Sequence, residues 1–304
     1  MYTTITPIIK DNIQTLSRLP YSFISVLGID AEKFLQGQLS CDLSTLDSEH
    51  IQFGTMNTPK GRMYGLFKIA RIENGFLLRL ESSTVELFLT NIKKYKVFFK
   101  CEINIEERYS AFAYIASQDN KPIFPEKAYQ LAHIGSDVIA CISNSAPLFE
   151  IWSQDQNIHH LVTGTDSEAW FAMEAKMGIP ELYDVTQDQF ILQYLNLQDL
   201  GAVSFKKGCY TGQEIIARMK FLGKLKKKMF LLSSPEKFTK KAGADIFTED
   251  GKKCGSIVRS HWSAQTGSIT LAILSTSYSE SNSKVYFDLE KSHPFTVSEL
   301  NYAL

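Results

Sequence analysis

The C-terminal part of the chain consists of short apolar segments separated by turn signals. Asp250-Gly251 stands between two of these segments and is typical of a tight β-hairpin. Several short strands at close spacing favour a small closed sheet, because closure leaves no unpaired edge. We therefore predict an antiparallel β-barrel over residues 225–304, with strands at 228–232, 244–247, 255–262, 268–274, 284–289 and 295–300.

Strand and helix patterns alternate in the rest of the sequence, which favours the α+β class. We predict two α/β domains, residues 1–106 and 107–224, ahead of the barrel domain, residues 225–304. The candidate strands are residues 21–27, 51–56, 63–72 and 75–80 and a β-rich run at 97–105 in the first domain, and 111–116, 137–142 and 148–152 in the second. Helix starts are predicted at Asp30, at the pair Ser83 and Glu86, and at the pair Thr165 and Glu168. Residues 182–205 are expected to form an ordered connection.

Composition excludes several classes of protein. Apolar residues make up 44% of the 304 residues, which excludes general disorder. The 32 basic and 33 acidic residues nearly cancel, so any contact with a polyanion has to be local. No signal peptide and no apolar run of membrane-spanning length is visible, and the five scattered cysteines include no C-x-x-C pair. We expect a cytoplasmic monomer with no membrane contact and no metal site.

One cysteine stands between a lysine pair and a predicted helix start. Lys206, Lys207 and Gly208 precede Cys209, and Tyr210-Thr211-Gly212-Gln213-Glu214 follow it. Thr211 and Glu214 have the spacing of a capping box, which places Thr211 at the N-cap and Tyr210 and Ile215 at the positions of a hydrophobic staple. Ammonium groups and a helix N-terminus both favour the thiolate over the thiol. Cys209 is therefore a candidate nucleophile with Lys207 as its partner, although a purely structural turn remains the alternative.

The same run resembles the signature K-G-C-Y-x-G-Q-E of the YgfZ family of folate-binding proteins, which are relatives of the glycine-cleavage aminomethyltransferase. Residues 28–38, 57–63, 178–180 and 196–197 also resemble segments of that family, so the likeness spans nearly the whole chain. The resemblance implies two ferredoxin-like α/β domains and a C-terminal antiparallel β-barrel, arranged in a ring around a central folate site.

The resemblance also implies a ligand, tetrahydrofolate or a one-carbon derivative of it. Trp170 matches a family tryptophan implicated in folate contact, and Tyr21 falls where relatives carry a second tryptophan. Asn196 is a candidate for the pterin edge, and Arg62 for the glutamate tail. Core packing for the two aromatic residues, a turn role for Asn196 and a solvated charge for Arg62 stay open as alternatives. The remaining motif residues, to which we assign structural roles, are Gly208, Tyr210, Gly212, Gln213, Glu214 and Arg218.

The segment after the Lys60-Gly61 turn carries no carboxylate. Residues 61–67 read Gly-Arg-Met-Tyr-Gly-Leu-Phe, where the aminomethyltransferases carry acidic residues, so that reaction is not expected here. The resemblance implies instead an accessory protein, not an enzyme, that supports iron–sulfur enzymes and tRNA methylthiolation, with an iron–sulfur enzyme such as a tRNA methylthiotransferase as partner and only indirect or weak tRNA contact.

Two other functions stay open. The first is a folate-dependent one-carbon transferase or demethylase that acts on an unknown acceptor. The second is direct tRNA binding by a basic stripe, whose members are Lys220, Lys224, Lys226, Lys227 and Lys228.

Overall fold

The computed structural model describes residues 4–11, 13–116, 124–144, 147–164, 167–221, 225–280 and 284–302. Contacts divide the chain into two compact units, the first with residues 1–54 and 67–167 and the second with residues 55–66 and 168–303. The boundaries of the three predicted domains stay a prediction. Within the described residues, none of the helices has the length and apolar character needed to cross a membrane.

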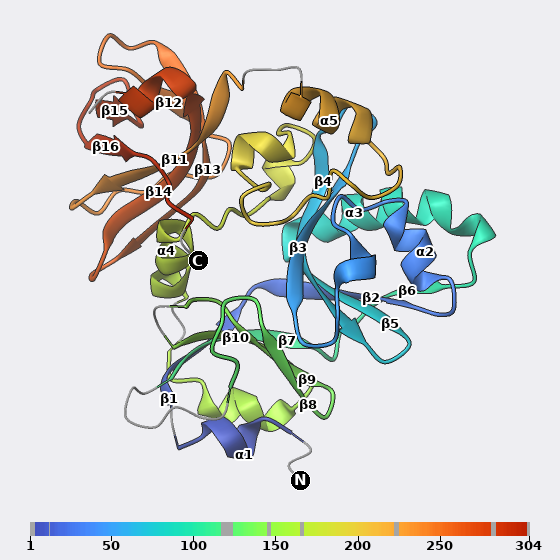
Figure 1. Ribbon diagram of the computed structural model, residues 1–304. Coiled ribbons are helices and arrows are strands. Elements are labelled where there is room, and N and C mark those ends of the chain that lie inside the picture. Colours follow the sequence, from blue (N-terminus) through green and yellow to red (C-terminus); the bar gives the residue numbers. More distant parts are fainter. Residues whose placement is uncertain are drawn as a thin grey trace. The chain divides into compact units, whose positions relative to one another are not determined.

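The first unit contains two antiparallel five-stranded sheets (Figure 1), except for residues 55–57 and 63–66 of one sheet, which belong to the second unit. One sheet has the order β3 (Ile51–Asn57), β4 (Met63–Ile72), β5 (Gly75–Glu81), β2 (Tyr21–Leu27) and β6 (Glu102–Ile105). The other has the order β1 (Ile13–Leu19), β7 (Ser110–Ala116), β10 (Leu148–Ser153), β9 (Asp137–Cys141) and β8 (Leu131–Ile134). The short connecting helices are α1 (Thr6–Ile9), η1 (Leu43–Thr45), η2 (Ser82–Thr84), η3 (Lys93–Phe98) and η4 (Gln156–Leu161).

Alternation along single strands explains how the sheets pack. Phe67 on β4 meets Phe88 on α3 (Val85–Ile92), with ring centroids 6.1 Å apart, while the next residue, Lys68, points away from that helix toward the other sheet. On β10, Phe149 and Ile151 join the core that also holds residues of α1 and η4. The intervening residues, Glu150 and Trp152, therefore face the first sheet. Packing of the two sheets thus puts Lys68 of β4 and Glu150 of β10 into a buried interface.

The second unit contains a closed six-stranded barrel with the order β11 (Lys227–Ser234), β14 (Gly267–Ser275), β13 (Lys253–Ser263), β12 (Asp245–Phe247), β15 (Lys284–Tyr286) and β16 (Pro294–Ser298). The 3-10 helix η7 (Thr276–Glu280) directly follows β14 in the chain. Phe230, Phe287 and Phe295 are among the buried residues that fill it. Helix α4 (Glu168–Lys176) packs against β13 and β14, as Figure 1 shows. Between α4 and α5 (Gln213–Phe221) the chain forms η5 (Asp184–Thr186) and η6 (Leu192–Leu195).

The α+β class, the two sheets and the C-terminal barrel are confirmed, and the hairpin at Asp250-Gly251 joins β12 to β13. Two strands, β1 and β8, were not predicted. The β-rich run at 97–105 is only partly a strand, because residues 93–98 form η3 and β6 begins at Glu102.

Two predicted helix starts differ in their capping. Asp30 stands at the N-cap position of α2 (Ala31–Gln36), as predicted, but makes no cap hydrogen bond, because its carboxylate accepts from the backbone N–H of Lys100 at 2.8 Å. Ser83 does not cap α3 either. Ser83 lies inside η2, and the N-cap of η2 is Glu81. The Glu81 carboxylate accepts from the backbone N–H of Ser83 at 2.8 Å. The Thr165 cap falls outside the described residues.

Candidate functional site

The cysteine motif is an exposed loop that leads into α5. Lys206, Gly208 and Cys209 are exposed to solvent. Helix α5 begins at Gln213, so Gly212, and not Thr211, directly precedes the helix. The loop therefore presents the Cys209 thiol to solvent shortly before the helix N-terminus.

Two residues close to Cys209 in the sequence, Lys207 and Tyr210, are buried and hold the loop in place. Lys207 is only 9% exposed and Tyr210 only 6%. The Lys207 ammonium lies 5.4 Å from the centroid of the Tyr210 ring, a cation–π distance. The backbone N–H of Lys207 donates to Ser204 Oγ at 3.2 Å. Lys207 is thus no solvated loop charge, and an exposed thiol sits between two anchored residues.

The β3–β4 turn packs directly against this motif within the second unit. Gly212 has φ +84°, and a Cβ built on it would lie 2.5 Å from the carbonyl oxygen of Thr58. A Cβ on Gly61, whose φ is +73°, would lie 3.1 Å from the side chain of Ile215. The turn Asn57–Arg62 is closed by the Thr58 N–H, which donates to Arg62 O at 2.7 Å. Two motifs about 150 residues apart in the sequence are thereby brought together by glycines at the point of closest approach.

Two of the predicted folate contacts have protein partners. The exposed guanidinium of Arg62 donates to Asp188 O at 3.2 Å. Asn196, at φ +52°, uses its side-chain amide to donate to Met229 O at 3.0 Å and to accept from Met229 N at 3.2 Å. These contacts give Asn196 the turn role that the sequence left open, and they fix the chain to β11. A folate contact of either residue stays a prediction.

Trp170 on α4 is buried, with 3% of its surface exposed. Its indole N–H has no hydrogen-bond acceptor among the described residues. An unsatisfied buried donor costs about 1–3 kcal/mol, so a site that leaves one open is suited to a ligand that brings an acceptor. The carbonyl or ring nitrogen of a pterin is an acceptor of this kind.

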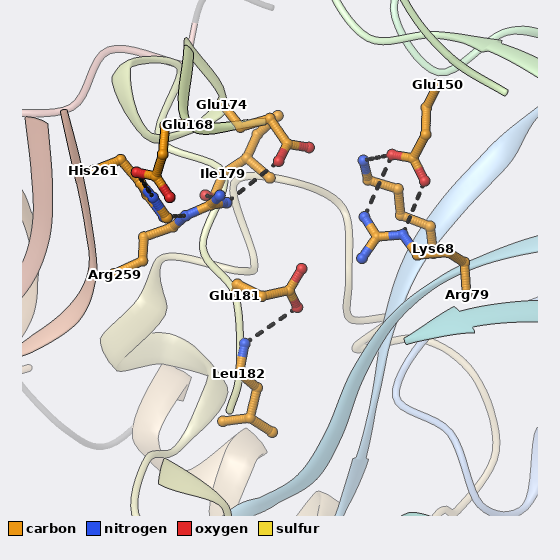
Figure 2. Close-up of polar contacts among 10 residues, drawn as sticks. All are labelled: Lys68, Arg79, Glu150, Glu168, Glu174, Ile179, Glu181, Leu182, Arg259 and His261. Atoms are coloured by element: carbon orange, nitrogen blue, oxygen red, sulfur yellow. Dashed lines mark hydrogen bonds and ion pairs between the residues drawn. The ribbon is translucent and has the colours of Figure 1, made fainter. Parts of the chain in front are cut away.

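A charged network that the sequence analysis missed lies between α4 and β13 (Figure 2). Arg259 Nε donates to His261 Nε2 at 3.1 Å, and Arg259 Nη1 approaches Glu174 Oε2 at 3.4 Å and Ile179 O at 3.2 Å. His261 Nδ1 lies 3.0 Å from Glu168 Oε2. Because a guanidinium N–H only donates, His261 Nε2 has to carry the lone pair, and the imidazole is neutral with its proton on Nδ1. Burial and the charge of Arg259 both lower the pKa of His261.

A second buried network joins the two sheets of the first unit, also drawn in Figure 2. Glu150 Oε2 accepts from Lys68 Nζ at 2.5 Å, and Glu150 Oε1 accepts from Arg79 Nε at 2.9 Å and from Trp152 Nε1 at 2.7 Å. Burial opposes ionisation of Glu150, but the charges of Arg79 and Lys68 outweigh it and lower the pKa of Glu150 to about 2. The Arg79 guanidinium also lies over the ring of Tyr21, 3.7 Å from its centroid.

Tyr21 therefore has one face covered by a cation. The residue is 8% exposed and lines a hollow of about 610 Å³ together with Arg18, Phe23 and Tyr109. Its predicted folate contact stays a prediction. A sequence signal for both networks exists, since Lys68, Arg79, Glu150 and Arg259 each interrupt an apolar strand segment with a charge.

The other motif residues lie around the loop and along α5. Glu214 and Arg218 are exposed, Gln213 is half-buried, and Gly208 has open space where a Cβ would stand. Among the described residues, no three His, Cys, Asp or Glu side chains are grouped closely enough to hold a metal ion. What these residues offer chemically is one solvent-exposed thiol at Cys209 and, on α4, a buried N–H donor at Trp170 with no acceptor among the described residues.

Comparison with known proteins identifies the family. No protein-family model matches the chain. The fold is similar to that of the glycine cleavage system aminomethyltransferase T from Bartonella henselae, with a TM-score of 0.72 and 13% identity over 95% of this chain and 86% of that one. The tRNA-modifying protein YgfZ from Aliivibrio fischeri is 32% identical over 273 residues, which cover 86% of this chain and 85% of the relative. Its counterpart from Colwellia psychrerythraea is 30% identical over 282 residues, which cover 85% of this chain and 87% of the relative. The chain thus belongs to the YgfZ family.

Proposed function

We propose that this chain is a tetrahydrofolate-binding accessory protein that supports tRNA modification by maintaining an iron–sulfur enzyme, with Cys209 as its reactive thiol. Both YgfZ relatives carry the name tRNA-modifying protein, which supports the tRNA part of the proposal. The observation that supports a reactive thiol is the exposed position of Cys209 between the buried residues Lys207 and Tyr210. A thiol in such a position can meet a macromolecular client, which a buried cysteine cannot.

The residues of the second unit also suit a folate ligand. The unpaired indole N–H of Trp170 would donate to an acceptor of the pterin, and the exposed Arg62 and Lys60 would attract the carboxylates of the glutamate tail. Tetrahydrofolate, or a one-carbon derivative of it, would supply a carrier of one-carbon units. The residues of this chain would bind and orient it.

Calorimetric titration with tetrahydrofolate tests the ligand. The Trp170→Phe variant keeps an aromatic ring but loses the N–H, so its affinity should fall by about 3- to 10-fold, the value of one hydrogen bond. Trp262→Phe is the matched control, because Trp262 is half-buried on β13 with its ring against Lys237 and should leave affinity unchanged. Equal affinities for the wild-type protein and Trp170→Phe would remove Trp170 from the site.

Complementation tests the thiol. The Cys209→Ser variant should fail to restore methylthiolated nucleosides in the tRNA of a bacterial strain that lacks its own YgfZ, while keeping its melting temperature and its folate affinity. Full restoration by Cys209→Ser would refute the role of the thiol. Turnover of a methyl- or methylene-folate by the purified protein, lost in Cys209→Ser, would favour the one-carbon transferase instead.

A further inference from the structure

We propose that a surface of the first unit, formed by Ile29 and residues 93–100, binds a single-stranded segment of RNA. We call it the η3 patch, after the 3-10 helix Lys93–Phe98. The proposal deepens the proposed function, because it names the surface by which the chain would meet tRNA directly, and it rests on that function only for the identity of the RNA.

The η3 patch exposes three large apolar side chains next to one another. Phe98 is 92% exposed, Val97 is 79% exposed and Ile29 is 84% exposed. Ile29 is brought to η3 by the neighbouring residue, since Asp30 N donates to Lys100 O at 3.3 Å and Lys100 N donates to the Asp30 carboxylate at 2.8 Å. Large apolar side chains gathered at one place on a surface mark interaction sites more often than chance.

The exposure of Phe98 follows from the way its neighbour is anchored. The Phe99 ring packs against Phe34 of α2 (Ala31–Gln36), with centroids 5.3 Å apart, and Phe99 N donates to Lys96 O at 2.9 Å. Phe98 is the last residue of η3, and its side chain stays 92% exposed while the ring of Phe99 is held against α2. The Phe98 ring is therefore presented on a fixed backbone.

A hollow of about 730 Å³ lies beside these side chains. Leu27, Phe99 and Cys101 contribute its apolar lining, and Lys93, Lys96 and Lys100 contribute three cations. Glu102 contributes a carboxylate to the same hollow. The volume falls in the range of roughly 300–1,000 Å³ that is typical of ligand clefts, which is room for an unstacked base.

The lysines of the η3 patch outnumber the carboxylates beside them, which are Asp30 and Glu102. Within the part of the chain that the structure describes, Lys93, Lys96 and Lys100 form no ion pair, and Lys94 donates to Asn91 Oδ1 at 2.9 Å. The formal charge of the whole chain is −1, so this positive charge is local. Two lysines of the basic stripe differ, because Lys228 is paired with Glu299 at 2.6 Å and the Lys220 ammonium lies 3.7 Å from the Phe205 ring centroid. Lys224 of the stripe lies outside the described residues.

Lysines interleaved with an exposed aromatic ring suit single-stranded RNA better than an acidic peptide. Phosphates meet the lysine ammonium groups, and an unpaired base stacks on the flat face of Phe98. An acidic peptide would use the same lysines but gains little from a ring that stands out of the hollow. The observations therefore favour RNA as the occupant.

The test measures binding of a fluorescein-labelled ten-nucleotide single-stranded RNA, and of an unmodified tRNA transcript, to the full-length protein at several salt concentrations. Phe98→Ala should weaken binding by roughly 5- to 150-fold, the range for loss of one stacked base. The triple variant Lys93→Gln, Lys96→Gln, Lys100→Gln should make the slope of log K against log salt less negative by about 2, because each lost phosphate contact accounts for about 0.7. Lys93, Phe98 and Lys100 are exposed and Lys96 is half-buried, so the variants should keep the wild-type melting temperature.

The matched control is the pair Lys226→Gln, Lys227→Gln, two exposed lysines of the basic stripe, which should leave both quantities unchanged. Loss of RNA binding in this control, with wild-type behaviour of the η3 variants, would overturn the proposal in favour of the stripe. A decamer of glutamate that binds as tightly as RNA and is indifferent to Phe98→Ala would overturn it in favour of an acidic protein partner. Measurements in Cys209→Ser keep the two proposals apart, since RNA binding should persist there while tRNA modification is lost.

Discussion

Lys68 on β4 donates to Glu150 on β10 at 2.5 Å, across an interface of two sheets where neither side chain is exposed to solvent. Arg79 adds a second cation to the same carboxylate at 2.9 Å. One carboxylate thus faces two buried cations, and removal of this carboxylate leaves both cations without a counter-charge. Glu150 thus joins its own sheet to two strands of the other sheet, β4 and β5.

Replacement of Glu150 by Gln should lower the free energy of unfolding by about 3–5 kcal/mol, because two buried cations lose their counter-charge. Urea unfolding at pH 7 measures the effect. Ser82→Ala, which removes an exposed hydroxyl bonded to Pro20 O on the same unit, is a control with an expected loss below about 1 kcal/mol. A Glu150→Gln variant as stable as the wild-type protein would show that the ion pairs do not hold the sheets.

The wild-type protein and Glu150→Gln should also differ in acid. The folded-state pKa of Glu150 lies below its ordinary value of 4.5, at about 2, so its contribution to stability is present above pH 4.5 and is lost as the pH falls toward 2. In Glu150→Gln this loss is absent, and its stability should fall less steeply over that range. Unfolding curves at pH 4.5 and pH 3 measure the difference.

The predictions from sequence succeeded where a pattern is local. The barrel strands and the bounds of β2 and β4 followed from apolar period and turn signals, which depend on neighbouring residues. The two predicted caps differ in the structure for the opposite reason. Asp30 is a good N-cap residue, but a backbone N–H at Lys100, 70 residues away, takes its carboxylate. Tertiary competition of this kind leaves no trace near Asp30 in the sequence.

In the candidate site, too, the sequence revealed the local motif but not the contacts between distant elements. The sequence motif located Cys209, and the structure leaves that thiol exposed. It did not reveal that the β3–β4 turn packs on Gly212, nor that Arg259 and His261 meet Glu168, because those contacts join elements far apart in the chain. A charged residue within an apolar strand segment was the available signal for the buried networks.

The His261 network should make stability depend on pH. Burial and Arg259 lower the pKa of His261 below 6.5, so the unfolded chain takes up the proton more readily than the folded protein does. The stabilisation is present above pH 6.5 and is lost as the pH falls through the lowered pKa. His261→Gln should therefore lose less stability than the wild-type protein between pH 7.5 and pH 5.5 in urea unfolding. Parallel pH profiles of the two proteins would contradict the neutral imidazole.

Two glycines of the motif should respond differently to the same change. Gly212→Ala should cost more than about 2 kcal/mol, because φ +84° is strained for alanine and its Cβ would meet Thr58 O at 2.5 Å. Gly208→Ala is the matched control, since a Cβ there has open space, and it should change stability by less than about 1 kcal/mol. Thermal unfolding of both variants decides the matter. Equal losses would mean that the β3–β4 turn does not press on the motif as described.

Selective alkylation should single out Cys209 among the five cysteines. Cys41, Cys101 and Cys141 are buried, and Cys254 is half-buried, whereas Cys209 is exposed. Burial raises the pKa of the Cys101, Cys141 and Cys254 thiols, which lowers their thiolate fraction at neutral pH and slows attack on an electrophile. Iodoacetamide at pH 7 should label one thiol of the folded protein rapidly, and peptide mass spectrometry should place the label on Cys209. Cys209→Ser should lack the rapid phase of labelling, whereas the control Cys254→Ser should keep it. A rapid phase that survives in Cys209→Ser would assign the accessible thiol to another cysteine and remove the physical basis for a reactive Cys209.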